Sequence, residues 1–244
     1  LLSYRESMPS IEIMARPYLK LAGLRIDPAT RGRKLSARTR RIALLVVATA
    51  SEIPVAVDGA GHLANFTWSP DGARFAFTNT VSDGVELWVC DVASAKARRL
   101  DGISLSSFFG GPIQWMPDGK TLLCRVVANT GPAPARPRAP GGPNVQESAG
   151  IKAPVRTYQD LLQDEHDAKV FEHLGASKIC LVNADDGKTK TVGAAGLHAS
   201  VSPSPDGTLL LWQTIHRPFS LLSTYRSFPR RIAAGRSGTS RGAR

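Results

Sequence analysis

The stretch "WSPDG" at residues 68–72 is repeated as "WMPDG" at 115–119 and, in a shorter form, as "SPSPDG" ending at Gly207. Proline fixes φ at the first corner of a tight turn, aspartate bonds back to its own backbone, and glycine takes the left-handed corner. Each copy therefore predicts the same turn between two strands. The tryptophan or small residue ahead of the turn predicts packing against a neighbouring repeat.

The residues around each turn predict short strands. Around the first turn, "ANFTWS" precedes it, "ARFAFTNT" follows it, and after an Asp-Gly turn come "VELWVCDV" and "RRL". Around the second, "PIQWMPDGKTLLCRVV" is completed by the distant hairpin "SKICLVNADDGKTKTV" at 177–192. The third, "ASVSPSPDGTLLLWQTI", is followed by no matching hairpin. The first repeat is thus a complete four-stranded unit.

The spacing of the turns identifies the architecture. Pro117 follows Pro70 by 47 residues, and Pro205 follows Pro117 by 88, which is one period plus an insertion. Four short strands in a repeat of this length are typical of β-propeller blades. We predict an all-β fold, a partial β-propeller of about two and a half four-stranded blades with one helix-bearing insertion. Because so few blades cannot close a ring, we expect self-association through exposed blade edges.

Three regions are expected along the chain. Residues 1–51 form an N-terminal flank, partly irregular, in which "IALLVVATA" at 42–50 suits a buried strand. Residues 52–220 form the incomplete propeller, with the insertion at 128–176. The last region, 221–244, is a basic tail that we expect to be disordered from 233. Its Arg/Gly/Ser-rich composition also indicates a shifted reading frame or a mispredicted gene end.

The insertion has two parts. Its first part, "ANTGPAPARPRAPGGPN", is rich in proline and glycine and predicts an extended surface loop. In its second part, "RTYQDLLQDEHDAKVFEHL" at 156–174, apolar residues recur at near-helical spacing, which predicts a helix. The apolar residues are Leu161, Leu162, Val170, Phe171 and Leu174.

The net charge of +11 is unevenly distributed. Residues 1–50 carry +7 and residues 217–244 carry +7, whereas residues 51–216 carry −3. A nucleic-acid groove needs basic side chains on the folded surface, interleaved with aromatic ones. We therefore expect no nucleic-acid partner. The longest apolar run covers nine residues, so we expect no membrane span, and no secretory signal is recognised.

No residue is assigned to catalysis, a metal or a cofactor. The acidic cluster of Asp160, Asp164, Glu165 and Asp167, with His166 and His173, is expected on a solvated helix face, because consecutive residues point in different directions. "GTSRG" at 238–242 has the G-x-S-x-G pattern, but no Asp or His follows Ser240. The odd set Cys90, Cys124 and Cys180 predicts buried thiols, without a disulfide framework or a zinc site.

Three stretches resemble the glutamyl endopeptidase branch of the prolyl oligopeptidase superfamily. They are "ARPYLKLAGLRIDP" at 15–28, the segment 142–174 that carries "RTYQDLL", and "SPSPDGTLLLWQTIHRPFS" at 202–220. The resemblance covers roughly residues 9–30 and 52–232. It implies a bacterial serine peptidase in which an N-terminal propeller screens access to an α/β-hydrolase domain with a Ser-Asp-His triad, and which cleaves peptides after Glu.

None of the triad residues can be carried over to this sequence. We therefore expect a non-catalytic part of the substrate-gating propeller, whose parent receives peptide substrates through the hydrolase domain. On this resemblance Arg217, at the exit of the last predicted strand beside His216, is a candidate contact for an acidic substrate side chain. The alternative is a stand-alone propeller that serves as a binding or scaffold module.

Overall fold

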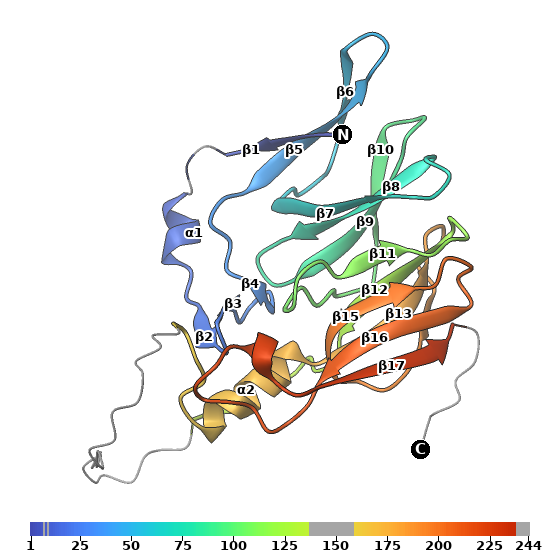
Figure 1. Cartoon of the computed structure of the whole chain (residues 1–244). Coiled ribbons are helices and arrows are strands. Elements are labelled where there is room, and N and C mark those ends of the chain that lie inside the picture. Colours follow the sequence, from blue (N-terminus) through green and yellow to red (C-terminus); the bar gives the residue numbers. More distant parts are fainter. Residues whose placement is uncertain (7, 9, 137–158, 238–244) are drawn as a thin grey trace, which may run out of the picture.

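The computed structural model describes residues 1–6, 8, 10–136 and 159–237. Its strands form antiparallel sheets that lie one on the next, with a smaller sheet beside them (Figure 1). The first sheet has the order β1-β5-β6. Its strands are β1 (Leu2–Arg5), β5 (Thr39–Val46) and β6 (Ser51–Val55). Since β6 pairs with β5, the paired hairpin crosses the boundary that we expected at 51/52.

The next two sheets have four strands each, as the sequence predicts for its first two blades. The first blade has the order β10-β9-β8-β7 and the second has the order β11-β12-β13-β14. The strands of the first are β7 (His62–Trp68), β8 (Arg74–Thr80), β9 (Val85–Asp91) and β10 (Lys96–Leu100). Those of the second are β11 (Ile113–Trp115), β12 (Thr121–Val127), β13 (Ser177–Asn183) and β14 (Thr189–Thr191). The insertion therefore lies between the two middle strands of the second blade.

The third blade has three strands, one more than the half copy that we predicted. They are β15 (Leu197–Pro203), β16 (Leu209–Ile215) and β17 (Arg230–Arg236). The expectation of disorder from residue 233 is wrong as far as Ser237, because β17 pairs with β16 along its whole length. A Cβ on Gly235 would lie 2.6 Å from the ring of Trp212, so this glycine allows the close packing of the two strands. Residues 238–244, with Ser240, lie outside the described residues.

The three Pro-Asp-Gly corners adopt the predicted turn. Gly72, Gly119 and Gly207 have φ of 68°, 64° and 71°, and the carboxylates of Asp71, Asp118 and Asp206 accept from backbone N–H groups within their own turns. Successive corners also lie against one another. A Cβ on Gly119 would be 3.5 Å from the Asp71 carboxylate, and one on Gly207 would be 3.3 Å from Pro117. The repeated turn is therefore part of the packing between blades.

Apolar side chains fill each space between successive sheets. The first sheet meets the first blade through Ile42, Leu44, Phe75 and Phe77, among others. Leu87, Val89, Trp115 and Leu122 belong to the cluster between the first and second blades. Met116, Leu123, Ile179 and Leu210 belong to the cluster between the second and third. The expected strand at 42–50 is only partly confirmed, because β5 ends at Val46 and Val47 is 91% exposed.

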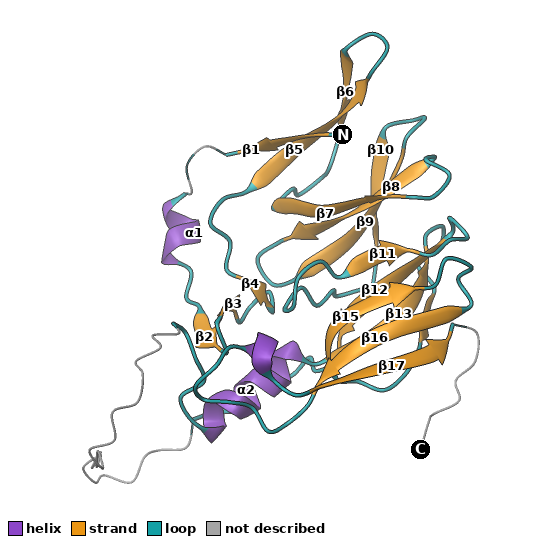
Figure 2. Ribbon diagram, viewed as in Figure 1, coloured by secondary structure: helices purple, strands orange, loops and turns teal. Residues whose placement is uncertain are grey.

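The strand ends opposite the corners are covered by a cap of short elements and one longer helix (Figure 2). The cap consists of α1 (Ile11–Ala15), β2 (Leu19–Leu21), β3 (Leu24–Asp27), β4 (Gly32–Arg33), α2 (Glu165–Gly175) and the 3₁₀ turn Tyr225–Ser227. Its core joins segments far apart in the sequence, since Phe171 of α2 packs with Ile26, Phe108 and Phe228. Four of the aromatic rings in contact with Phe171 lie 5.3–5.9 Å from it, centroid to centroid.

Helix α2 begins later than the sequence pattern predicts. Asp164 caps it, and the Asp164 side chain accepts a 2.8 Å hydrogen bond from the backbone N–H of Asp167. Leu161 and Leu162 therefore precede the helix, although Leu162 is still buried in the cap core. The predicted helix residues 156–158 lie outside the described residues.

Candidate functional site

Arg217 lies just after β16 and fastens the insertion helix to the third blade. Its Nε and Nη2 donate to the two carboxylate oxygens of Glu172 at 2.7 and 2.8 Å, and its Nη1 donates to Glu165 at 2.7 Å. These bonds to Glu172 and Glu165 raise the pKa of Arg217. The guanidinium also lies 5.2 Å from the ring centroid of Phe219. An acidic substrate side chain would have to displace one of these carboxylates.

The charge of the cavity beside Arg217 does not favour the binding of an acidic ligand. It measures about 570 Å³ and is lined by Asp164, Glu165 and Arg217, with Pro218 and Phe219 on its apolar side. Both Glu165 and Glu172 bond to the single guanidinium of Arg217, so this group of charges is negative. The pairing of Arg217 therefore gives it a clear structural role, as the attachment of the insertion.

The acidic residues between 160 and 167 and His173 do not converge on one point. Asp160 pairs with Lys20 and Arg25, at 3.5 and 2.8 Å. Asp164 and Asp167 both pair with Arg136. The Nε2 atom of His173 lies 3.0 Å from the carbonyl oxygen of Gly131. Over the described ranges, no group of three or more His, Cys, Asp or Glu side chains is arranged to hold a metal ion.

A cationic side chain that the sequence analysis did not single out is buried between the second and third blades. Arg125, on β12, is 7% exposed. Its two terminal nitrogens donate to four backbone carbonyls, those of Gly110, Gly111, His198 and Ala199, at 2.6–3.2 Å. Burial lowers the pKa of Arg125 to about 10. Its signal in the sequence is a single basic residue within the apolar strand "LLCRVV".

A bulge in β15 positions two of the carbonyls that accept from the Arg125 guanidinium. The pairing of β15 with β16 shifts register between His198 and Ser200. In a regular strand, consecutive carbonyls point to opposite sides, whereas a bulge turns two of them the same way. The carbonyls of His198 and Ala199 both accept from Nη1 of Arg125 as a result. The four hydrogen bonds of Arg125 therefore join the third blade to the loop that precedes β11.

A slot of about 230 Å³ lies beside Arg125. Its walls come from β11 and β12 on one side and β15 on the other, and they include Gln114, Leu123, Ser200 and Val201. Sequence reasoning could not find this slot, because it depends on how two blades pack.

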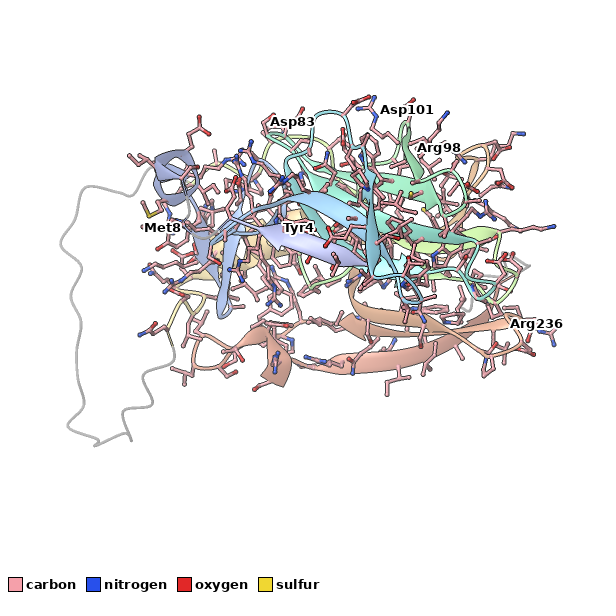
Figure 3. All side chains as sticks on the ribbon, turned by 90° about the horizontal axis from the view of Figure 1, so that it is seen from above. Tyr4, Met8, Asp83, Arg98, Asp101 and Arg236 are labelled. Carbon is pink, nitrogen blue, oxygen red and sulfur yellow. The ribbon has the colours of Figure 1, made fainter. Side chains whose placement is uncertain are left out.

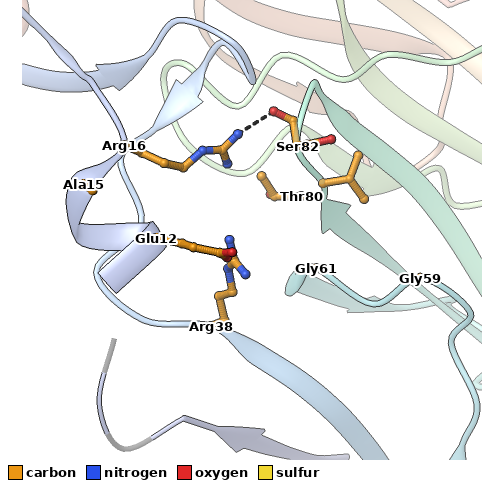
Figure 4. A pocket seen from close by; sticks show the side chains of 9 residues that line it. Glu12, Ala15, Arg16, Arg38, Gly59, Gly61, Thr80 and Ser82 are labelled. Atoms are coloured by element: carbon orange, nitrogen blue, oxygen red, sulfur yellow. Dashed lines mark hydrogen bonds between the residues drawn. The ribbon is translucent and has the colours of Figure 1, made fainter. Parts of the chain in front are cut away.

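A further cavity, of about 600 Å³, lies between α1 and the first blade (Figure 4). Glu12, Arg16 and Arg38 enter it from the N-terminal side, opposite Thr80 and Ser82. Arg16 spans it with a 2.5 Å hydrogen bond to the carbonyl oxygen of Ser82. Its charges are mixed, and the bond of Arg16 indicates that the N-terminal segment is tied to the blade there.

The three cysteines lie in the interior. Cys90, Cys124 and Cys180 are buried and free, as predicted, and burial raises the pKa of Cys90 to about 12. None of the helices formed by the described residues is long and apolar enough to cross a membrane.

Successive antiparallel sheets that each contain the same Pro-Asp-Gly corner and pack face to face define a propeller-type, all-β protein. No family model matches the sequence. Two curated relatives do: the probable chloroplastic glutamyl endopeptidases of Oryza sativa subsp. japonica and Arabidopsis thaliana. Each is 32% identical over 93% of this chain. The resemblance seen in the sequence is thus confirmed: nearly the whole of this chain is similar to part of two proteins named glutamyl endopeptidase.

These matches cover only part of each relative. The chain spans 26% of the rice protein and 25% of the Arabidopsis protein. Both relatives are plant proteins, so they do not support the bacterial source that we expected. Among solved structures, Pyrococcus horikoshii acylaminoacyl peptidase is 12% identical over 98% of this chain and 32% of its own, with a TM-score of 0.48. TolB from Acinetobacter baumannii is 16% identical over 80% of this chain and 37% of its own, with a TM-score of 0.42.

Proposed function

We propose that this chain is a non-catalytic, substrate-gating propeller segment of a serine peptidase that cleaves peptides after Glu. The observation that carries the proposal is the 32% identity to glutamyl endopeptidases over 93% of the chain. The repeated blades occupy most of that matched length. The peptide substrates, the cleavage after Glu and the gating role come from the names and family of the relatives, and they stay proposals for this chain.

A gating role is consistent with the chemistry of the described residues. Four acidic side chains of the insertion, those of Asp164, Glu165, Asp167 and Glu172, form ion pairs with Arg136 or Arg217, and the three cysteines are buried. Blades arranged around a channel can admit an extended peptide and exclude a folded protein, because the opening is narrow and its walls are packed sheets. In this proposal the segment selects what reaches the reaction and takes no part in bond cleavage.

The alternative is a stand-alone binding or scaffold module. It is favoured by the continuous packing from the first sheet to the third blade, since each interface has its own apolar cluster. Such a module would recognise the surface of a folded partner, whereas a gate would recognise unfolded chain.

The two functions are separated by what the chain binds. Fluorescence anisotropy would be measured with a labelled, unstructured peptide of about a dozen residues and with the same peptide held inside a folded carrier domain. The gate predicts binding of the free peptide alone. Equal binding of both forms would favour the module, and binding of neither would contradict the proposal.

A further inference from the structure

Three cationic side chains lie in a row on the exposed face of the small sheet β2-β3-β4. Lys20 lies opposite Arg25 in the β2–β3 pairing. Lys34, directly after β4, donates its backbone N–H to the carbonyl oxygen of Arg25 at 2.8 Å, which places it opposite Arg25 on the other side. Residues directly opposite in antiparallel strands share a face, and like charges so placed are destabilising. This row therefore favours the approach of negative charge.

One carboxylate compensates part of this charge. Asp160 lies 3.5 Å from Nζ of Lys20 and 2.8 Å from Nε of Arg25. The two terminal nitrogens of Arg25 donate to no described residue, since its bond to Asp160 comes from Nε. Three cations against one carboxylate leave an excess of positive charge on this face.

The third cation, Lys34, has no carboxylate partner among the described residues. Its Nζ donates to the carbonyl oxygen of Met14 at 3.2 Å and lies 4.0 Å from the ring centroid of Tyr18. The guanidinium of Arg25 is 5.7 Å from the same centroid. Because an ammonium has three N–H donors, Lys34 keeps N–H groups for a ligand.

A cavity of about 320 Å³ lies against this row, between the small sheet and α1 (Figure 1). Arg25 and Lys34 both line it, and none of its lining residues is an aspartate or a glutamate. Pockets that bind small molecules measure roughly 300–1,000 Å³, so this one has room for a ligand of modest size.

The walls of this cavity are mainly apolar. Ile13, Met14, Tyr18 and Leu35 supply them, and Ser36 adds a hydroxyl. Ile13 is buried and Met14 is exposed, so the apolar wall reaches from the interior to the rim. Apolar walls with a few polar groups that fix orientation are typical of small-molecule sites. A ligand that fits has an apolar body and one anionic end.

We infer that this cavity binds a small monocarboxylate with an aromatic or alkyl body. The body packs against Met14 and Tyr18, and the carboxylate accepts from Lys34 and from the terminal nitrogens of Arg25. A guanidinium fork can pair with both oxygens of a carboxylate at once. The inference does not rest on peptide gating, and the cavity shares no lining residue with the slot beside Arg125.

The test uses two probes that differ in charge. 4-Phenylbutanoate and 4-phenylbutan-1-ol are titrated into the 244-residue chain labelled with ¹³C at its methionine methyl groups. We expect 4-phenylbutanoate to shift the Met14 signal saturably and to bind at least about tenfold more tightly than the alcohol, since hydrogen bonds to charged groups are the stronger ones. Met116, between the second and third blades, is the internal reference and should not shift. Added salt should weaken the binding, because exposed charges are screened.

A pair of lysine variants locates the carboxylate. Lys34→Gln keeps a donor for the Met14 carbonyl and removes the charge, so it should weaken the binding of 4-phenylbutanoate about three- to fivefold, as expected of a partly exposed ion pair. Lys120→Gln is the matched control, because Lys120 is an exposed lysine beside the second corner, at the end of the blades opposite the cap. It should leave the affinity unchanged, and both variants should bind the alcohol as the parent chain does.

Equal binding of the acid and the alcohol, or no shift of Met14 with either, would overturn the inference. So would a Lys34→Gln chain that binds the acid as tightly as the parent chain does. If the chain sediments with phosphatidylglycerol vesicles and does not bind the free acid, the cationic face contacts a membrane surface, and the cavity is not a ligand site. A saturable shift of Met14 that needs the carboxylate, and that Lys34→Gln weakens and Lys120→Gln does not, supports the inference.

Discussion

The indole N–H of Trp115, in the second blade, donates a 3.0 Å hydrogen bond to the carbonyl oxygen of Thr67, in the first. The guanidinium of Arg74 lies 5.5 Å from the Trp115 ring centroid and bonds to Asp185 and to the carbonyl oxygen of Gly119. Trp115 is 5% exposed, whereas the equivalent Trp68 of the first blade is 46% exposed. The tryptophan of the repeated motif is thus buried in the second blade, at the interface with the first, but about half exposed in the first blade.

This difference predicts unequal effects of the same substitution. Trp115→Phe removes the bond to Thr67 and leaves its carbonyl unpaired, so we expect a loss of about 1–3 kcal/mol in the free energy of unfolding. Trp68→Phe should cost well under about 1 kcal/mol, because half-exposed sites tolerate such changes. Urea unfolding of both variants measures this. Equal losses would show that Trp115 does not join the two blades.

The corner glycines offer a second matched pair. Gly72→Ala and Gly207→Ala both place a side chain at positive φ, which costs about 1–2 kcal/mol. At Gly72 the new Cβ meets nothing within 4 Å, whereas at Gly207 it meets Pro117 of the preceding corner at 3.3 Å. We expect Gly207→Ala to be the more destabilising in thermal unfolding. The opposite order would contradict the packing of one corner on the next.

Local turn chemistry is the part of this fold that the sequence predicts well. "PDG" corners and alternating strands such as "ARFAFTNT" depend on neighbouring residues, so two whole blades could be foreseen. The third strand of the last blade could not, because the composition of "RRIAAGR" is typical of disorder and its order depends on pairing with β16. Likewise Leu161 and Leu162 continue a helical pattern, but Asp164 begins the helix after them.

The partners of Arg217 and the burial of Arg125 could not be predicted from the sequence. The position of Arg217 after a strand predicts an available cation. In the structure its N–H groups donate to Glu172 and Glu165, which lie 45 and 52 residues earlier in the chain, on α2. Arg125 was overlooked because a lone arginine in an apolar strand has no pattern of its own. Its role depends on a bulge in β15 and on the packing of two blades, which are properties of the folded chain alone.

The attachment of the insertion through Arg217 predicts a local effect. Glu172 accepts two hydrogen bonds from Arg217, whereas Glu165 accepts one. We therefore expect Glu172→Gln to destabilise α2 more than Glu165→Gln does. Because the groups are partly exposed, each loss should stay within about 1 kcal/mol. Hydrogen exchange of the α2 amides measures it. Unchanged exchange in Arg217→Gln would show that the pair does not hold the helix.

The buried imidazole of His198 predicts a dependence of stability on pH. Burial lowers the pKa of His198. Its Nε2 faces the carbonyl oxygen of Ala194, which can only accept, so the neutral ring keeps its proton there and Nδ1 accepts from Thr214. A pKa lowered in the folded state means that the unfolded chain binds more protons, so stability is lost as pH falls below about 6.5.

The measurement compares urea midpoints near neutral pH and at about pH 5.5, below the ordinary histidine pKa. His198→Asn should lose less stability on acidification than the parent chain. His62 contributes in the same direction, since burial lowers its pKa as well, so the dependence should shrink and not vanish. His216→Asn, at an exposed position, serves as the control and should behave like the parent.

The outer face of the third blade predicts self-association. In Figure 3 the sheet that ends at Arg236 forms one side of the molecule. Leu211 and Ile232 share its open face and are 52% and 72% exposed. We expect Leu211→Lys to lower the weight-average mass in sedimentation, and Met14→Lys, on α1, to leave it unchanged. A monomeric parent chain at every concentration would rule this association out.

In the proposed function, this chain selects peptides without cleaving them. Incubation of the purified chain with a Glu-containing chromogenic peptide, with and without a serine-reactive inhibitor, tests this. We predict no release of chromophore that the inhibitor suppresses. Release that the inhibitor abolishes would show that the chain has its own hydrolytic centre, and it would contradict the proposed non-catalytic role.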